Sequence, residues 1–169
     1  MAVLSILQFP DPRLKRIARP VETLDDRIQT IIDDMFETHY QQENCAALAA
    51  TQLDMDDPPA ITVIDFSPNK DEPLCLINPT IVNRTGEQFE TEGCMSVGLH
   101  TTRPHEKVKR AMHITVEALD RKGQLQQYDV SGFMAKCMQH EIDHLGGIIY
   151  LDRLSPLRRK RLLAKLPLA

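Results

Sequence analysis

The stretch SGFMAKCMQHEIDHLGG, residues 131–147, constrains the fold and the chemistry of this chain more than any other segment. Its apolar residues recur at helical spacing, which predicts an amphipathic helix that begins near Ser131 or Gly132. Gly146 and Gly147 are expected to end that helix, because glycine adopts helix-terminating conformations at little cost. The segment therefore predicts one well-defined helix late in the chain.

Two histidines in this helix are spaced for metal binding. His140 and His144 would lie one turn apart on the same face, so that both imidazoles could reach one ion. Glu141 would lie beside that ion, where its carboxylate could take a proton from an attacking water. A surface or core helix with two histidines by chance would show the same pattern. The motif thus indicates a metal-dependent hydrolase without establishing one.

A hydrolytic metal site usually has three protein ligands and one open position, so a third ligand is needed. After His144 the sequence contains no further histidine, and Asp152 is the only acidic residue there. Upstream, Cys94 stands in the glycine-containing segment EGCMS, residues 92–96, and a thiolate binds zinc or iron(II) strongly. A single cysteine is more often a small buried hydrophobic residue. The residues alone leave Asp152 and Cys94 as candidates.

The composition is that of a soluble globular protein, and we expect one domain over residues 1–169. The formal net charge of −4 argues against a general nucleic-acid binder, so no DNA partner is expected. No apolar run approaches the roughly 18 residues of a membrane span. The N-terminus lacks the basic region and cleavage site of a signal peptide. These features favour a cytoplasmic protein whose four cysteines are reduced.

The rest of the pattern predicts an α+β fold. Helical spacing from Leu24, with Thr23 and Asp26 as a cap pair, predicts an N-terminal helix that ends near Gln42. The first twenty residues contain three prolines and are expected to run extended over the core. Segments rich in β-branched residues predict strands at residues 60–66, 74–82, 113–119 and 126–130. We therefore expect antiparallel or mixed sheets around a central helix that carries the HExxH motif, with an N-terminal and a C-terminal helix.

Three segments together resemble the signatures of the peptide deformylase family. Residues 92–96, EGCMS, and 139–144, QHEIDH, agree with the second and third signatures in order, spacing and flanking residues. Residues 45–52, CAALAATQ, are similar to the first signature. The opening FPDPRL, residues 9–14, and the closing LSPL, residues 154–157, also resemble family segments. The resemblance covers nearly the whole chain.

The resemblance implies an enzyme that removes the formyl group from the N-terminal methionine of new polypeptides, usually with iron(II). Zinc, nickel or cobalt would suit the same ligand types. It implies Glu141 as the general base that later donates its proton to the leaving amine. The Gln52 side chain and the backbone N–H of Met95 correspond to donors to the developing oxyanion. It implies three metal ligands: Cys94, His140 and His144.

Two departures from the family pattern bear on the fit of the substrate. Cys45 and Ala47 replace glycines of the first signature, which adds a Cβ at each position and restricts the backbone wherever a positive φ is needed. Gly98 stands where the family usually has proline, and the stretch from there to Met112 is a few residues longer than usual. These changes keep two alternatives open. One is a non-catalytic or altered-specificity paralogue, and the other is a different small metallo-amidase or peptidase, which would cleave unformylated peptides.

The remaining polar residues receive minor roles. Cys137 is expected in the core, and Asp143 either accepts a hydrogen bond from a ligand histidine or is solvated. Four histidines are expected to be structural or exposed: His39, His100, His105 and His113. The tail from Arg153 carries basic residues and no acid, and it predicts an amphipathic helix. By resemblance that helix docks to the ribosome, whereas a merely solvated helix is the alternative.

Overall fold

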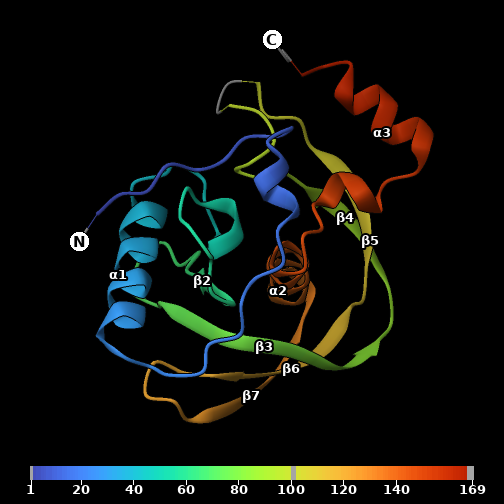
Figure 1. The fold of residues 1–169 in the computed structure, drawn as a ribbon. Coiled ribbons are helices and arrows are strands. Elements are labelled where there is room, and N and C mark those ends of the chain that lie inside the picture. Colours follow the sequence, from blue (N-terminus) through green and yellow to red (C-terminus); the bar gives the residue numbers. More distant parts are fainter. Residues whose placement is uncertain (1, 100–101, 167–169) are drawn as a thin grey trace.

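The computed structural model describes residues 2–99 and 102–166. Within these residues the fold has three helices and seven strands (Figure 1). The helices are α1 (Asp26–Tyr40), α2 (Gly132–Leu145) and α3 (Pro156–Leu163). The strands are β1 (Ala47–Ala49), β2 (Ile61–Ile64), β3 (Leu74–Thr85), β4 (Gln88–Glu92), β5 (Glu106–Arg110), β6 (His113–Leu119) and β7 (Leu125–Ser131). Short 3-10 turns are η1 (Pro12–Lys15), η2 (Ala50–Gln52) and η4 (Tyr150–Arg153). The predicted α+β class is confirmed.

The strands form two antiparallel sheets around α2. One sheet has the order β1-β2-β3-β6-β7, and the other consists of β4 and β5. Figure 1 shows α2 end-on near the middle of the fold, with β3, β6 and β7 on one side and β4 and β5 on another. The HEIDH sequence lies on this helix, as expected.

An apolar face holds α2 against the larger sheet. Ala135, Cys137 and Met138 pack in one buried cluster with side chains of β2, β3 and β6, including Ile64, Leu76 and Val116. Fully burying a residue such as Met138 contributes roughly 1.5–3 kcal/mol. Cys137 is 8% exposed, so its predicted place in the core is confirmed. With this face fixed, the remaining faces of α2 are available to the site.

The N-terminal helix begins later than expected. Asp25 is its N-cap, and the Asp25 side chain accepts a hydrogen bond from the Ile28 N–H at 3.0 Å. The predicted start at Leu24 and the cap pair of Thr23 and Asp26 are therefore wrong. Several acceptors stand side by side here, and periodicity does not tell which one meets the free N–H groups of the first turn.

The first twenty residues are partly extended and partly buried. They include the turn η1, and Leu7, Leu14 and Ala18 belong to the core. The Leu7 N–H bonds to the Gln52 carbonyl and the Phe9 N–H to the Ser96 carbonyl, each at 2.7 Å. This segment therefore ties together two loops that are far apart in the sequence. Both loops contribute to the site described below.

Three strands have no counterpart among the four segments predicted above: β1, β4 and β5. β4 and β5 carry mostly charged or polar residues; only Gln88 and Glu92 are buried in β4, and only Val108 and Arg110 in β5. The predicted basic helix is confirmed as α3, whose N-cap Ser155 accepts from the Arg158 N–H and whose Leu162 is buried. No helix in the described part of the chain is long and apolar enough to cross a membrane.

Candidate metal centre and pocket

Three predicted ligands converge on one point. His144 Nε2 lies 3.2 Å from His140 Nε2 and 3.3 Å from Cys94 Sγ. All three ligand atoms lie within 4.8 Å of one another, and they form the one such group among the described residues. Asp152, the other candidate, binds Arg159 at 2.9 Å and accepts from the Ile149 N–H instead. The structure thus favours Cys94 over Asp152 as the third member of the group.

The spacing and chemistry of the group fit a divalent ion. Tetrahedral bonds of about 2.0–2.3 Å from nitrogen and sulfur place neighbouring ligand atoms roughly 3.3–3.6 Å apart, close to the spacing found. Burial lowers the pKa of His144, which keeps its imidazole neutral and able to coordinate. Cys94 Sγ accepts a hydrogen bond from the Ser96 N–H at 3.4 Å, which helps to hold the sulfur beside the His144 imidazole. The residues present therefore suit a metal such as iron(II) or zinc.

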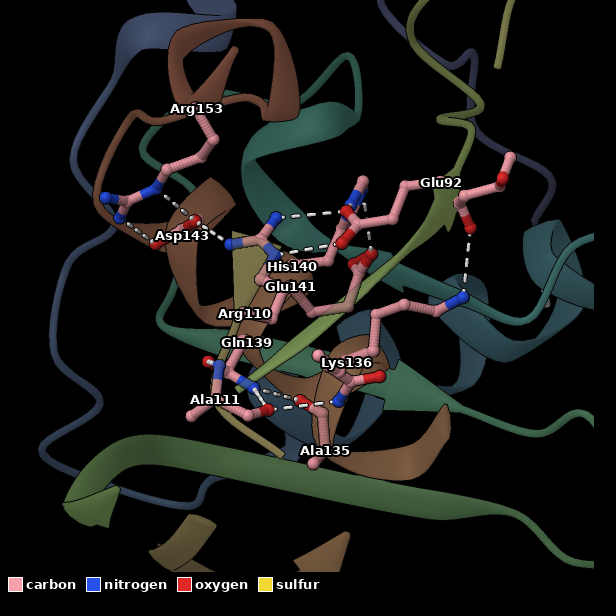
Figure 2. A network of polar contacts seen from close by, with 12 residues as sticks. Glu92, Arg110, Ala111, Ala135, Lys136, Gln139, His140, Glu141, Asp143 and Arg153 are labelled. Carbon is pink, nitrogen blue, oxygen red and sulfur yellow. Dashed lines mark hydrogen bonds and ion pairs between the residues drawn. The ribbon is translucent and has the colours of Figure 1, made fainter. Parts of the chain in front are cut away.

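A chain of buried ion pairs orients His140 (Figure 2). His140 Nδ1 lies 2.8 Å from Glu92 Oε1, and Arg110 donates to both oxygens of Glu92 at 2.9 and 3.0 Å. Burial opposes ionisation of Glu92, but the hydrogen bonds from His140 and Arg110 lower its pKa to about 2. The ionised Glu92 can only accept, so Nδ1 carries the proton and Nε2 is left free for an ion.

The chain of ion pairs continues to the surface. Arg110 also binds Asp143 at 2.5 Å, and Arg153 donates to both Asp143 oxygens at 2.8 and 3.0 Å. One expectation was that Asp143 accepts a hydrogen bond from a ligand histidine, and the other was that it is only solvated. The structure shows neither arrangement. Asp143 supports His140 indirectly: it binds Arg110, Arg110 binds Glu92, and Glu92 contacts His140. Sequence reasoning missed Glu92, Arg110 and Arg153 in these roles, because their positions follow no periodic pattern.

Glu141 stands next to the group without joining it. Its Oε1 lies 3.9 Å from His140 Nε2, and the residue is 3% exposed. Its Oε2 is buried and has no hydrogen-bond partner in the part of the chain that the structure describes. Burial raises the pKa of Glu141 to about 7. A carboxyl group with a pKa near neutrality suits proton transfer in both directions.

Gln52 and Met95 lie beside Cys94. The Gln52 Oε1 accepts from the Ala49 N–H at 2.9 Å, and its Nε2 donates to Ser96 Oγ at 3.1 Å and points toward Cys94 Sγ at 3.6 Å. The Met95 carbonyl accepts from Gln8 Nε2 at 2.6 Å, which fixes the peptide next to Cys94. The fold therefore brings both predicted donor residues to the metal centre.

A cavity of about 350 Å³ opens in front of these residues. Its wall includes the apolar side chains of Ala46, Ala47, Met95 and Cys137, together with Cys94 and His140. The cavity is large enough for one flexible apolar side chain placed next to the metal centre. The site can thus hold an apolar residue with its adjoining amide close to the ion.

Comparisons with known proteins agree with this geometry. The family model described as polypeptide deformylase matches residues 3–160. A peptide deformylase 1 of Coxiella burnetii is 62% identical over 160 residues, which cover 95% of this chain and 92% of that protein. The chain belongs to the polypeptide deformylase family.

Solved deformylase structures share the fold. A peptide deformylase from Legionella pneumophila superposes with a TM-score of 0.86 at 41% identity, covering 97% of this chain and 93% of that one. A peptide deformylase from Ehrlichia chaffeensis, in complex with actinonin, also gives 0.86 at 34% identity, covering 98% and 96%. The fold and the order of its elements are therefore those of the deformylase family.

The glycine replacements in the first deformylase signature do not strain the backbone. The positive φ of 55° in this loop falls on Asn44, and neither Cys45 nor Ala47 has a positive φ. Cys45 Sγ contacts His39 Nδ1 at 3.1 Å, and burial raises the pKa of this thiol to about 12. Only the Ala47 replacement lines the cavity. No positive φ is needed at either position, so the replacements do not restrict the backbone there, whereas Ala47 does line the cavity.

The second departure from the deformylase pattern has a local cause. Gly98 has a φ of +86°, which proline cannot adopt. A Cβ on Gly98 would lie 2.8 Å from Pro104 Cδ and 3.0 Å from the Arg103 Cα. The chain therefore turns back at Gly98 and brings residues 102–105 against the start of the same loop.

The other histidines fall in different places. His39 is buried between Cys45 and the Asp65 carbonyl, so it is structural as expected, and His113 is exposed. His105 is exposed as expected but also lines the cavity. Its ring lies so close to Gly93 that an added Cβ there would be 2.6 Å from its Nε2. His100 lies outside the described residues.

Proposed function

We propose that this chain removes the formyl group from the N-terminal methionine of newly made polypeptides. The observation that carries the proposal is the convergence of Cys94, His140 and His144 beside Glu141, at the end of a cavity that fits an apolar side chain. Membership in the deformylase family supports the same conclusion. The substrate is then a formylated nascent peptide whose methionine side chain occupies the cavity.

In this proposal Cys94, His140 and His144 hold one divalent ion. We infer that the native ion is iron(II), with zinc, nickel and cobalt as replacements that accept the same ligands. When bound, the ion activates water and polarises the formyl oxygen as a Lewis acid. The ion pairs of Glu92 keep the ligand nitrogen of His140 directed at it.

Glu141 moves the proton. Its carboxylate accepts a proton as water oxygen bonds to the formyl carbon, and it returns that proton to the methionine nitrogen as the carbon–nitrogen bond breaks. Formate and a free amino terminus are the products. In this proposal the Gln52 amide and the Met95 N–H donate to the formyl oxygen as charge develops there, and one such donor typically contributes about 3–4 kcal/mol.

We also infer that α3 contacts ribosomal RNA, in the cytoplasm where nascent chains emerge. Arg158 and Arg159 pair with Glu106 and Asp152. Among the described residues, Lys160, Arg161 and Lys165 have no such ion pair, which leaves a basic face free to attract phosphates. Salt-dependent cosedimentation with ribosomes that weakens in Lys160→Gln/Arg161→Gln would support this contact. Unchanged cosedimentation would argue against it.

The test of the main proposal compares two peptides that differ only at the amino terminus. Protein purified anaerobically with iron(II) should release formate from formyl-Met-Ala-Ser and leave Met-Ala-Ser intact. Cleavage of peptide bonds in Met-Ala-Ser would instead identify a peptidase. A full complement of metal with no release of formate would identify a non-catalytic paralogue.

A further inference from the structure

Three basic side chains line the cavity that we assign to the substrate: Arg103, His105 and Lys136. Arg103 and His105 come from the segment that precedes β5, whereas Lys136 lies on α2 one turn before His140. These basic side chains thus come from two separate elements of the fold. Among the residues that the structure describes, no carboxylate forms an ion pair with any of the three.

The two carboxylates of the cavity do not neutralise Arg103 or Lys136. Glu92 is already held by Arg110 and His140 and is 5% exposed. Glu141 lies at the inner end beside His140 and is 3% exposed. The outer part of the cavity therefore presents positive charge to whatever enters it.

Arg103 is held in place by the turn at Gly98. Its Nε donates to the Gly98 carbonyl at 3.4 Å, and the neighbouring Pro104 carbonyl accepts from the buried Tyr150 hydroxyl at 3.2 Å. The Tyr150 ring in turn lies 6.1 Å from the His140 ring. The guanidinium is thus anchored through its inner nitrogen, and its terminal nitrogens remain able to donate to a ligand.

Lys136 is anchored in a similar way. Its ammonium group donates to the Thr91 carbonyl at 3.0 Å and lies 4.8 Å from the centre of the Phe133 ring (Figure 2 shows Lys136 and its contact). An ammonium group has three donors, so this contact leaves donors for a second acceptor. Its position at the wall of the cavity is therefore fixed, although no carboxylate among the described residues pairs with it.

The proposed substrate has no charge at its amino terminus, so the positive charges of the cavity can distinguish substrates by their side chains. Formylation removes the positive charge of the amino terminus, so the charge of the substrate near the site comes from its side chains. In an extended peptide the second and third residues lie within about 7 Å of the methionine Cα, and their side chains point to opposite sides. One of them can then face each wall of the cavity.

We propose that this chain favours formylmethionyl substrates with an acidic residue at the second or third position, recognised by Arg103 and Lys136. The proposal rests on the deformylase function proposed above and names a substrate class within it. Partly exposed ion pairs of this kind typically change affinity by about two- to fivefold each.

The test uses isosteric peptides, so that only charge changes. With wild-type iron(II) protein, kcat/KM for formyl-Met-Asp-Ala is compared with formyl-Met-Asn-Ala, and formyl-Met-Ala-Asp with formyl-Met-Ala-Asn. We expect an Asp-to-Asn ratio of about three at one position or more in low salt, carried mainly by KM and falling as salt rises. Ratios at or below one at both positions would overturn the proposal.

Variants locate the effect. Arg103→Gln/Lys136→Gln should bring the ratio close to one, whereas Lys122→Gln, which removes one positive charge from the exposed β6–β7 turn, should keep the wild-type ratio. An unchanged ratio in the double variant would overturn the assignment. Hydrolysis of the asparagine peptides shows in the same experiment that the deformylase function holds. If none of the four peptides is hydrolysed, that function fails, and this proposal fails with it.

Discussion

The carboxylate of Glu92 lies 2.8 Å from His140 Nδ1 and is held on its other side by two hydrogen bonds from Arg110. Arg110 is 7% exposed, so this arrangement places a guanidinium, a carboxylate and an imidazole together out of water. A buried charge is tolerated only when it is paired. The metal centre and the stability of the fold therefore depend on the same ion pairs.

Glu92→Gln should weaken metal binding more than its small change in shape suggests. The amide holds His140 less firmly than the carboxylate does, and loss of such a partner typically lowers metal affinity by about 10- to 100-fold. It also leaves Arg110 short of a charge partner, which should lower the free energy of unfolding by about 3 kcal/mol. Metal competition and chemical denaturation measure the two effects. Glu90→Gln, an exposed change in the same strand, is the control and should leave both values as in the wild type.

Substitution of Asp143 should destabilise the fold much more than substitution of Arg153, although the two residues form one ion pair. The Arg153 side chain is 44% exposed, so Arg153→Gln should cost at most about 1 kcal/mol of stability. Asp143→Asn removes a partner of the buried Arg110 and should cost about 3 kcal/mol. Denaturation curves of both variants check the order. Equal losses would mean that the inner and outer ion pairs are energetically alike.

Substitution of Glu141 should lower the rate but keep the metal, whereas substitution of Cys94 should lose much of the metal. Glu141→Ala should retain about one metal ion per chain and lose a factor of about 100 or more in kcat, because the proton acceptor is gone. Cys94→Ala should lose much of the metal itself, because a three-ligand group becomes a two-ligand group. Metal content and formate release on the same samples separate the two. A Cys94→Ala protein with wild-type metal content and rate would refute its role as a ligand.

Gly98→Pro should damage the cavity although it restores the residue that is usual in the family. Proline cannot adopt the φ of +86°, and its ring would collide with Pro104 and Arg103. We expect lower stability, by about 2 kcal/mol, from the strained turn. Thermal unfolding of Gly98→Pro and of the wild-type protein measures the difference. A Gly98→Pro protein as stable as the wild type would show that the loop can take another path.

Local patterns in the sequence predicted the parts of the site that share one helix. The HEIDH spacing alone placed two histidines and the glutamate, because an α-helix converts sequence separation directly into direction. Cys94 needed the family resemblance, since a lone cysteine carries no spatial information. The pairing of Glu92 with Arg110 was out of reach, because the two residues are not opposite one another in the register of β4 and β5, where Glu92 lies opposite Glu106 and Arg110 opposite Gln88.

The errors at element ends have a similar origin. Asp25 caps α1 in place of the expected pair, because neighbouring acceptors compete for the same N–H groups and only the final geometry selects one. Neither Cys45 nor Ala47 has a positive φ, so neither replacement strains the backbone, and no pattern in the sequence predicts that the positive φ of this loop falls on Asn44. That residues 1–169 act as one domain remains a prediction.

The coordination of the bound ion tests the central claim most directly. X-ray absorption at the metal edge of protein loaded with iron(II) should show one sulfur ligand at about 2.3 Å and two imidazole nitrogens at about 2.1 Å, with light-atom scattering from solvent completing the shell. The sulfur contribution should vanish in Cys94→Ser. A shell of oxygen and nitrogen alone in the wild-type protein would contradict the assignment of Cys94, His140 and His144 as the metal centre.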